Sequence, residues 1–276
     1  MSANNNLQDW VGRQQKATDF ISATHAKKIA YSVNAPMPVD GENLPLLWHW
    51  AFFIDPMPLG ELGEDGHPAR GGFLPPADNR NRMWAGGRLN FINDLVIGKE
   101  AERTTTIKAV VEKEGRTGKL LFVTLEHVYE QEGQVCIVEE QDLVYREPTP
   151  PKLMGDEPAP EAEWSQVVEA DSVMLFRYSA VTFNGHRIHY DYPYANGVEG
   201  YPGLVVHGPL IATKVLQGFT EEHPEKSVTH FSFRGVRPLI APEPFKVEGV
   251  VTDVNGATLW AQQEGTLAQK AEIKFI

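Results

Sequence analysis

Residues 184–191 place more chemically capable side chains together than any other part of this sequence. An amide, two imidazoles, a guanidinium and a carboxylate fall within these eight positions: Asn184, His186, Arg187, His189 and Asp191. An imidazole titrates near neutral pH, so it is suited to taking a proton from water and returning it. The segment therefore indicates acid–base catalysis.

A second candidate group opens the helix expected from Gly208 to Glu221. His207 and Gly208 stand at its start, and four apolar residues at helical spacing follow: Ala212, Val215, Leu216 and Phe219. The first N–H groups of a helix have no partner within it, and they lie at the positive end of its dipole. They could stabilise a developing oxyanion, and Gly208 would let a substrate approach the backbone closely.

A metal site is the alternative interpretation of the histidines. His186, His189 and His207 could supply three ligands, but the spacing of a zinc-binding helix is absent and no thiolate lies nearby. Cys136, the single cysteine, stands in an apolar run and is expected to be buried. We therefore expect no metal and no cofactor.

Composition limits the partners. The formal net charge of −12 disfavours nucleic acid and anionic membranes, both of which attract basic surfaces. No run approaches the ~20 apolar residues of a membrane span, and the first residues lack the basic and apolar regions of a signal peptide. These features predict a cytoplasmic protein.

Turn signals divide the second part of the chain. Residues 167–183 are rich in β-formers and read as a strand before the candidate site. Four more strands are expected after the helix, at 227–237, 245–254, 257–264 and 266–276. Asn255-Gly256 is a strong hairpin signal between the second and third of these.

The first part offers a similar order. The pattern predicts a helix over 7–22 and a short apolar helix over 45–53, capped by Asn43. Strands are expected at 103–113, 118–130 and 134–146, with alternate residues from Leu121 to Tyr129 on one face. The intervening segment 55–86 is long for a connector, so it is either a cover over the site or a mobile insertion.

An apolar helix followed by long antiparallel strands thus occurs twice. This repetition indicates an α+β fold in which a sheet wraps around a central helix in each half. The proline-rich stretch 148–164 reads as a linker between residues 1–147 and 165–276. Two domains are the expected organisation.

The amino-acid sequence of residues 176–191, with the later His207-Gly208, resembles the hydratase motif of the MaoC-like (hydratase-2) hotdog enoyl-CoA hydratases. It is most similar to the branch of mesaconyl-C4-CoA and itaconyl-CoA hydratases and 3-hydroxyacyl-thioester dehydratases. The resemblance implies a double hotdog whose first half is degenerate and shapes the substrate tunnel. It also implies a homo-oligomer and an acyl-CoA substrate.

The resemblance carries roles to individual residues. His189 falls on the catalytic histidine, and Gly208 on the glycine whose N–H polarises the thioester carbonyl. The family pattern is Asp-x-Asn-Pro-x-His, and here Asn184 stands at the aspartate, His186 at the asparagine and Arg187 at the proline. An amide cannot exchange a catalytic proton, so the donor stays open between the His189 imidazolium, a water and Asp191.

Arg187 and neighbouring aromatic residues suggest the substrate. Arg187 could receive the free carboxylate of a dicarboxylic acyl chain, although a salt bridge with an acidic neighbour is an equal alternative. Tyr178, Tyr190 and Tyr194 could line the acyl pocket, with His186 and Asp191 beside it. The sequence predicts a hydratase of itaconyl-CoA or mesaconyl-CoA. The alternatives are a fatty-acid 3-hydroxyacyl-thioester dehydratase and a non-catalytic acyl-CoA-binding protein.

Overall fold

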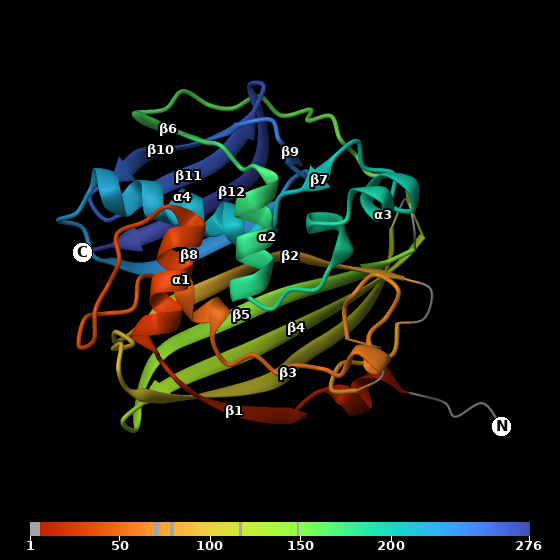
Figure 1. Cartoon of the computed structure of the whole chain (residues 1–276), viewed down its shortest axis with the longest axis horizontal. Coiled ribbons are helices and arrows are strands. Elements are labelled where there is room, and N and C mark those ends of the chain that lie inside the picture. The colour runs from red at the N-terminus through yellow and green to blue at the C-terminus, as the bar shows by residue number, and fades with distance from the viewer. Residues whose placement is uncertain (1–5, 69–71, 78–79, 116–117, 148) are drawn as a thin grey trace.

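A computed structural model describes residues 6–68, 72–77, 80–115, 118–147 and 149–276 (Figure 1). Ten antiparallel strands form one continuous sheet in the order β1-β3-β4-β5-β2-β8-β12-β11-β10-β6. The first half supplies β1 (Gln14–Phe20), β2 (Asn81–Phe91), β3 (Glu100–Gly115), β4 (Gly118–Gln131) and β5 (Gln134–Arg146). The second supplies β6 (Trp164–Val168), β8 (Val228–Gly235), β10 (Phe245–Asp253), β11 (Gly256–Gln263) and β12 (Thr266–Phe275).

The two halves join where β2 pairs with β8. Residues from Gly86 to Asn90 face those from Arg234 to His230 across this seam. Two further short strands, β7 (Leu204–Val205) and β9 (Ile240–Ala241), pair with each other. The expected α+β double hotdog is confirmed, with the sheets of its halves fused edge to edge.

Helices α1 (Ala23–Val33), α2 (Ser172–Val181) and α4 (Gly208–Glu222) lie together on one face of the sheet (Figure 1). Helix α4 is buried on nearly every side, as expected for a helix that a sheet wraps. Helix α1 packs on α2, so elements from the two halves meet over the sheet. The remaining helices are α3 (Tyr192–Gly197) and the 3₁₀ turns η1 (Leu7–Trp10), η2 (Trp48–Ala51), η3 (Leu59–Glu61) and η4 (Arg187–His189).

Seven of the eight strands expected after residue 100 are confirmed, as β3, β4, β5, β8, β10, β11 and β12. Alternation along β4 buries Leu121, Val123, Leu125, His127 and Tyr129, which is the face that the sequence predicts. Residues Val254 and Asn255 form the turn between β10 and β11. Strand β2, which begins inside the segment 55–86, was not expected.

The helix predicted over 7–22 is wrong. Residues Leu7–Trp10 form a single 3₁₀ turn. Gly12 then adopts a left-handed φ of 86°, which no helix can continue through, and strand β1 follows. Exposed and half-buried residues alternate along β1, which pairs with β3 at the sheet edge. Period-two burial at that edge therefore outweighed the helical spacing.

The short helix predicted over 45–53 is also wrong, since only Trp48–Ala51 forms a 3₁₀ turn. Leu47 and Phe53 adopt left-handed φ values of 69° and 57°, which an α-helix does not allow. Their side chains are nevertheless buried, so the apolar run is core without being a regular helix. The long helix of the first half is α1, where Ala26, Ile29, Ala30 and Val33 share a buried face.

The strand predicted over 167–183 ends at Val168, and helix α2 takes its place. Asp171 caps this helix by accepting a hydrogen bond from the Met174 N–H at 2.8 Å. Residues 184–191 therefore follow a helix rather than a strand. In the stretch between β5 and β6, Pro158 forms an isolated antiparallel β-bridge with Thr266 of the second half. The domain bounds at 148–164 stay a prediction.

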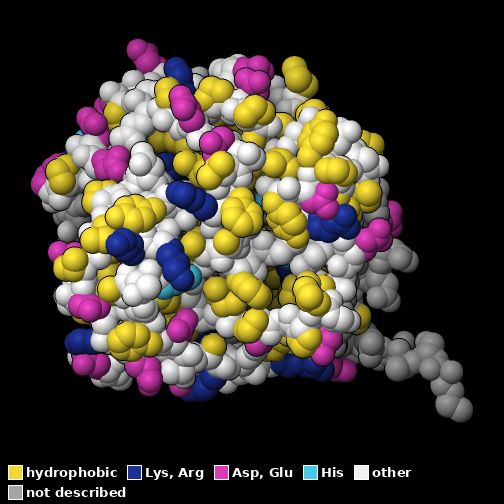
Figure 2. Space-filling model, in the orientation of Figure 1, with side chains coloured by type: hydrophobic (Ala, Val, Ile, Leu, Met, Phe, Trp, Pro, Cys, Tyr) yellow, Lys and Arg dark blue, Asp and Glu magenta, His cyan; other side chains and the backbone are white. Residues whose placement is uncertain are grey.

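Acidic and basic side chains are interspersed over the face in Figure 2, so the negative charge is not gathered there in one patch. Among the described residues, no helix is long and apolar enough to cross a membrane.

Candidate active site

His189 lies in the turn η4 with only 7% of its surface exposed. Its Nδ1 is 2.7 Å from the carbonyl oxygen of Val205. A carbonyl can only accept, so Nδ1 carries the hydrogen and Nε2 keeps its lone pair. Burial lowers the pKa of His189 to about 4, although the hydrogen bond to Val205 opposes this. The imidazole is therefore neutral near pH 7, which is the form a general base needs.

His207 fixes the other side of His189. The two rings stack with centroids 3.7 Å apart, and His207 is fully buried. Its Nε2 lies 2.8 Å from the Ser179 hydroxyl of α2, and the Tyr178 ring meets it edge to face. His207 thus holds the catalytic candidate against the start of α4, which agrees with a structural role for it.

Gly208 is the first residue of α4, and the space beside it is open. A Cβ built on Gly208 would meet no atom within 4 Å. Its carbonyl accepts a hydrogen bond from Gln269 Nε2 at 3.1 Å, while Pro209 supplies no N–H. The N–H of Gly208 is therefore the first donor of the helix, close to the ring stack. This is the arrangement that an oxyanion site requires.

Asn184 closes a tight turn after α2. Its Oδ1 accepts a hydrogen bond from the His186 N–H at 3.0 Å, and its own N–H donates to the Ser179 carbonyl at 2.8 Å. The amide oxygen is thus occupied, and the Nδ2 group is left to donate to a partner outside the turn. Asn184 can orient a water or a carbonyl oxygen but cannot supply a proton.

His186 meets a residue that the sequence motif did not include. Its ring lies 4.2 Å from that of His67 and 5.4 Å from that of His189. Asp65 Oδ2 lies 3.0 Å from His67 Nδ1, and ligand-capable atoms of Asp65, His67 and His186 all lie within 4.8 Å of one another. Burial first, then the charges of His67 and His189, lowers the pKa of His186, so this ring is neutral.

The segment 55–86 reaches this cluster as a cover, where it is described. The backbones of Gly66 and Gly185 pass so closely that a Cβ on Gly66 would lie 2.0 Å from the Gly185 oxygen. Arg187 ties the two segments, since its N–H donates to Asp65 O at 2.9 Å and its Nη1 to Glu64 O at 3.1 Å. These contacts favour the cover over the mobile insertion.

Arg187 is already engaged by its own segment. Its Nε donates to Asp191 Oδ2 at 2.9 Å, its Nη2 lies 2.8 Å from the same oxygen, and its guanidinium covers the Tyr194 ring. Asp191 also caps α3 through the Tyr194 N–H. The Arg187 hydrogen bond lowers the pKa of Asp191, so this carboxylate is ionised and cannot donate the missing proton. The salt bridge is present, and carboxylate binding by Arg187 stays a prediction.

The tyrosines are placed differently from one another. Tyr178 is buried and borders a small hollow between the helices and η2. The hollow is lined by Ile29, Leu47, Trp48, Trp50, Ala51, Tyr178, Thr182 and Thr213. Tyr190 is 45% exposed and its hydroxyl donates to Gly185 O at 2.9 Å, so it braces the turn instead. A pocket role for Tyr190 stays a prediction.

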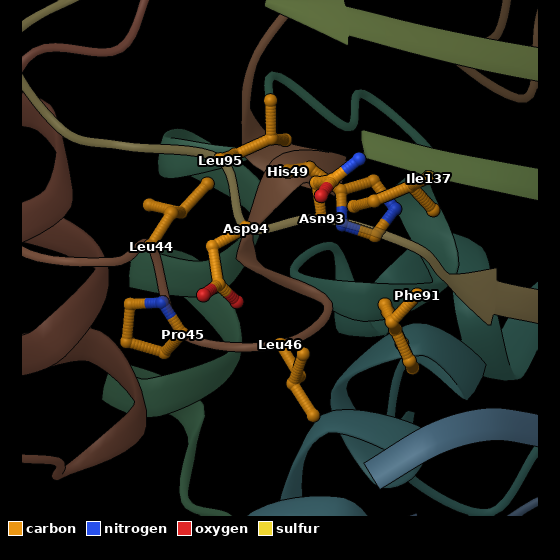
Figure 3. A pocket seen from close by; sticks show the side chains of 9 residues that line it. All are labelled: Leu44, Pro45, Leu46, His49, Phe91, Asn93, Asp94, Leu95 and Ile137. Carbon is orange, nitrogen blue, oxygen red and sulfur yellow. The ribbon is translucent and has the colours of Figure 1, made fainter. Parts of the chain in front are cut away.

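A second small hollow lies in the first half (Figure 3). Its lining includes His49, Asn93 and Asp94 but none of the motif residues. His49 turns to the buried Glu139, which also accepts hydrogen bonds from Trp50 and Tyr129. This network ties the core of the first half together, away from the candidate site.

A double hotdog with a neutral imidazole beside an open helix start fits the thioester hydratase or dehydratase that the sequence predicts. The family model of hydroxyacyl-thioester dehydratase type 2 matches residues 47–241. The chain belongs to this family, and it is an enzyme of the hydro-lyase class.

Two relatives span most of the chain. It is 42% identical over 243 residues to mesaconyl-C(4)-CoA hydratase of Chloroflexus aurantiacus, covering 86% of each protein. It is 29% identical over 268 residues to the mitochondrial hydroxyacyl-thioester dehydratase type 2 of Schizosaccharomyces pombe, covering 83% of this chain and 87% of that protein.

Solved structures agree on the fold. A MaoC-like dehydratase matches with a TM-score of 0.74 at 13% identity, covering 98% of this chain and 99% of that one. A Mycobacterium tuberculosis protein described as a double hotdog matches with a TM-score of 0.61 at 11% identity, covering 96% of each chain. At such identities the likeness concerns the fold alone.

Asp65 and His67 are the candidate site residues that sequence reasoning missed. The only signal was the cluster of Asp, Gly and His in the long segment 55–86. Nothing in the spacing of these residues linked them to a motif some 120 positions later.

Proposed function

We propose that this protein is an acyl-CoA hydratase that adds water reversibly across the double bond of a short, branched dicarboxylic enoyl-CoA. Mesaconyl-CoA and itaconyl-CoA are the substrates we favour, because the 42% identical relative is a mesaconyl-C(4)-CoA hydratase. One observation carries the proposal. The Val205 carbonyl fixes the His189 tautomer so that Nε2 can act as a base beside the open Gly208 helix start.

The geometry supports the following step. His189 Nε2 takes a proton from water as the water oxygen bonds to the β-carbon, and the double-bond electrons move toward the thioester oxygen. The Gly208 N–H stabilises the enolate oxygen that develops. Asn184 directs its Nδ2 donors at the water or the acyl chain. A proton must then reach the α-carbon.

Arg187 is our candidate for the receptor of the distal carboxylate. A substrate carboxylate would compete with Asp191 for the guanidinium, so the existing ion pair must loosen or share it. The Arg187→Ala variant should lose at least tenfold more kcat/KM on mesaconyl-CoA than on crotonyl-CoA, which lacks that carboxylate. An equal loss on both would leave Arg187 only its role in holding the cover.

The second candidate function is dehydration of 3-hydroxyacyl thioesters of fatty-acid synthesis on a carrier protein. The family and the yeast relative, which is a hydroxyacyl-thioester dehydratase, favour it. Parallel kcat/KM values for 3-hydroxyacyl groups on CoA and on acyl carrier protein separate the two. Family membership also favours an enzyme over a non-catalytic acyl-CoA-binding protein.

The direct test is the loss of enoyl-thioester absorbance with mesaconyl-, itaconyl- and crotonyl-CoA. Turnover of a dicarboxylic substrate above crotonyl-CoA supports the proposal. A preference for crotonyl-CoA would refute the dicarboxylic assignment, and no turnover of any thioester would refute the hydratase.

We further propose a homo-oligomer working in the cytoplasm. The buried single thiol, Cys136, needs no oxidising compartment. Light scattering of the purified protein and cell fractionation test these two statements, and a monomer or an exported protein would contradict them.

A further inference from the structure

The proposed reaction needs one more chemical group than His189, Gly208 and Asn184 supply. Hydration needs a group that gives a proton to the α-carbon, in addition to the base that activates water. Asn184 cannot exchange a proton, and Asp191 is ionised against Arg187. His189 takes its proton from the water in this scheme. A second protonatable side chain beside it would let the two proton transfers proceed from separate groups.

The cover brings such a group to the motif. His67 Nδ1 lies 3.0 Å from the Asp65 carboxylate, and the His67 N–H donates to the same residue's Oδ1 at 3.0 Å. The His67 ring packs on His186, whose ring in turn meets His189. Three imidazoles therefore run in contact from the carboxylate to the general base.

Asp65 distinguishes His67 from the other rings of this series. A carboxylate hydrogen-bonded to one imidazole nitrogen orients the ring and stabilises its charged form. Burial alone would raise the pKa of Asp65, but the His67 hydrogen bond and charge outweigh burial and lower it, so the carboxylate is ionised. Among the described residues, no carboxylate is hydrogen-bonded to the His186 ring. The charge of Asp65 favours protonation of His186, but burial and the charges of His67, His189 and Arg82 outweigh it.

The position of this pair is built into the fold. Gly66 lies between Asp65 and His67 and touches the Gly185 backbone, which only glycine allows at this φ of 85° and this separation. The Asp65 carbonyl accepts from the Arg187 N–H at 2.9 Å. The pair is thus attached on both sides to the segment that carries His186 and His189.

We propose that His67, held by Asp65, is the second acid–base residue of the site and donates the proton to the substrate's α-carbon. This rests on the proposed hydratase function. Asp65 is a positioning residue, since it acts through His67. In dehydration His67 removes the α-proton, and His189 protonates the departing hydroxyl group.

The step balances. An O–H bond of water breaks as its proton goes to His189 Nε2, and the oxygen bonds to the β-carbon. The double-bond electron pair becomes an enolate, and it then forms a C–H bond at the α-carbon with the proton of His67 Nε2. His189 ends protonated and His67 neutral, and solvent restores both before the next turnover.

The test compares the wild type with His67→Gln, Asp65→Asn and the control Glu61→Gln, which changes an exposed carboxylate of the same segment. His67→Gln should lower kcat for mesaconyl-CoA hydration about 10²- to 10⁴-fold with little change in KM. It should also abolish exchange of the product's α-proton in D₂O. Asp65→Asn should shift the alkaline decline of kcat to lower pH, because His67 then loses its proton more easily. Thermal unfolding checks that each variant folds.

Three outcomes would overturn the role. The first is a folded His67→Gln that keeps more than a tenth of wild-type kcat. The second is unchanged α-proton exchange in that variant. The third is loss of wild-type activity on chelation with recovery on adding Zn²⁺, which would make Asp65, His67 and His186 a metal site. A wild type inactive on every thioester would instead overturn the proposed function, and this role with it.

Discussion

Replacing Gly66 by alanine tests whether contact between the cover and the motif supports catalysis. A Cβ at Gly66 would lie 2.0 Å from the Gly185 oxygen, where ordinary contact needs more than 3 Å. The backbones must therefore separate by about 1 Å, and the left-handed φ of 85° adds about 1–2 kcal/mol of strain. A 1 Å misplacement can cost about 10²-fold in rate. We expect Gly66→Ala to lower kcat/KM about 100-fold while the protein stays folded.

Two matched variants separate the causes. Gly60→Ala lies in the same segment with open space and no positive φ, so it should leave kcat/KM unchanged. Gly12→Ala has the strained φ of 86° without a clash, so it should lower the melting temperature but not the activity. Steady-state kinetics on mesaconyl-CoA and thermal unfolding supply the measurements. Full activity of Gly66→Ala would refute the claim that docking of the cover matters.

Two further predictions concern the buried rings. Because the folded pKa of His189 is about 4 against 6.5 for a free imidazole, the unfolded state binds more protons between these values. Stability should therefore be complete above pH 6.5 and fall toward pH 4, by at most about 3 kcal/mol from this residue. His189→Gln should flatten the curve of unfolding free energy against pH only in part, since burial lowers the pKa of His186 and His207 too; an unchanged curve would contradict the buried neutral ring. Ser179→Ala removes the hydroxyl 2.8 Å from His207 Nε2, so urea unfolding should show a loss of about 1–3 kcal/mol. Ser172→Ala, at the exposed start of the same helix, should cost much less, and equal losses would discount the His207 contact.

Seven strands after residue 100 and helix α4 were predictable because their burial patterns are regular, whereas the strand expected over 167–183 is mostly helix α2. Alternate residues of β4 face the core, and α4 is apolar nearly all round. Helix α1 was missed although its buried residues have helical spacing, because the charged residues Lys27 and Lys28 interrupt its apolar pattern. The apolar run at 45–53 gave the opposite error. It was predicted to be a helix because it is apolar, but it is buried without forming a regular helix.

The candidate site likewise contains residues that the sequence predicted and residues that it did not. His189 and Gly208 were found from a local motif, and the structure brings them together through the stack with His207. The Asp65–His67 pair could not be found in this way, because its relation to His186 depends on a close backbone contact between Gly66 and Gly185. A single sequence carries no periodic signal for such a long-range contact.

The proposed function depends above all on His189 being the base that activates water. Its most direct test is kcat/KM for mesaconyl-CoA hydration by the His189→Ala variant, with folding checked by thermal unfolding. We expect a fall of about 10²- to 10⁴-fold in a folded protein. A folded variant that keeps more than about a tenth of the wild-type kcat/KM would show that His189 is not the general base.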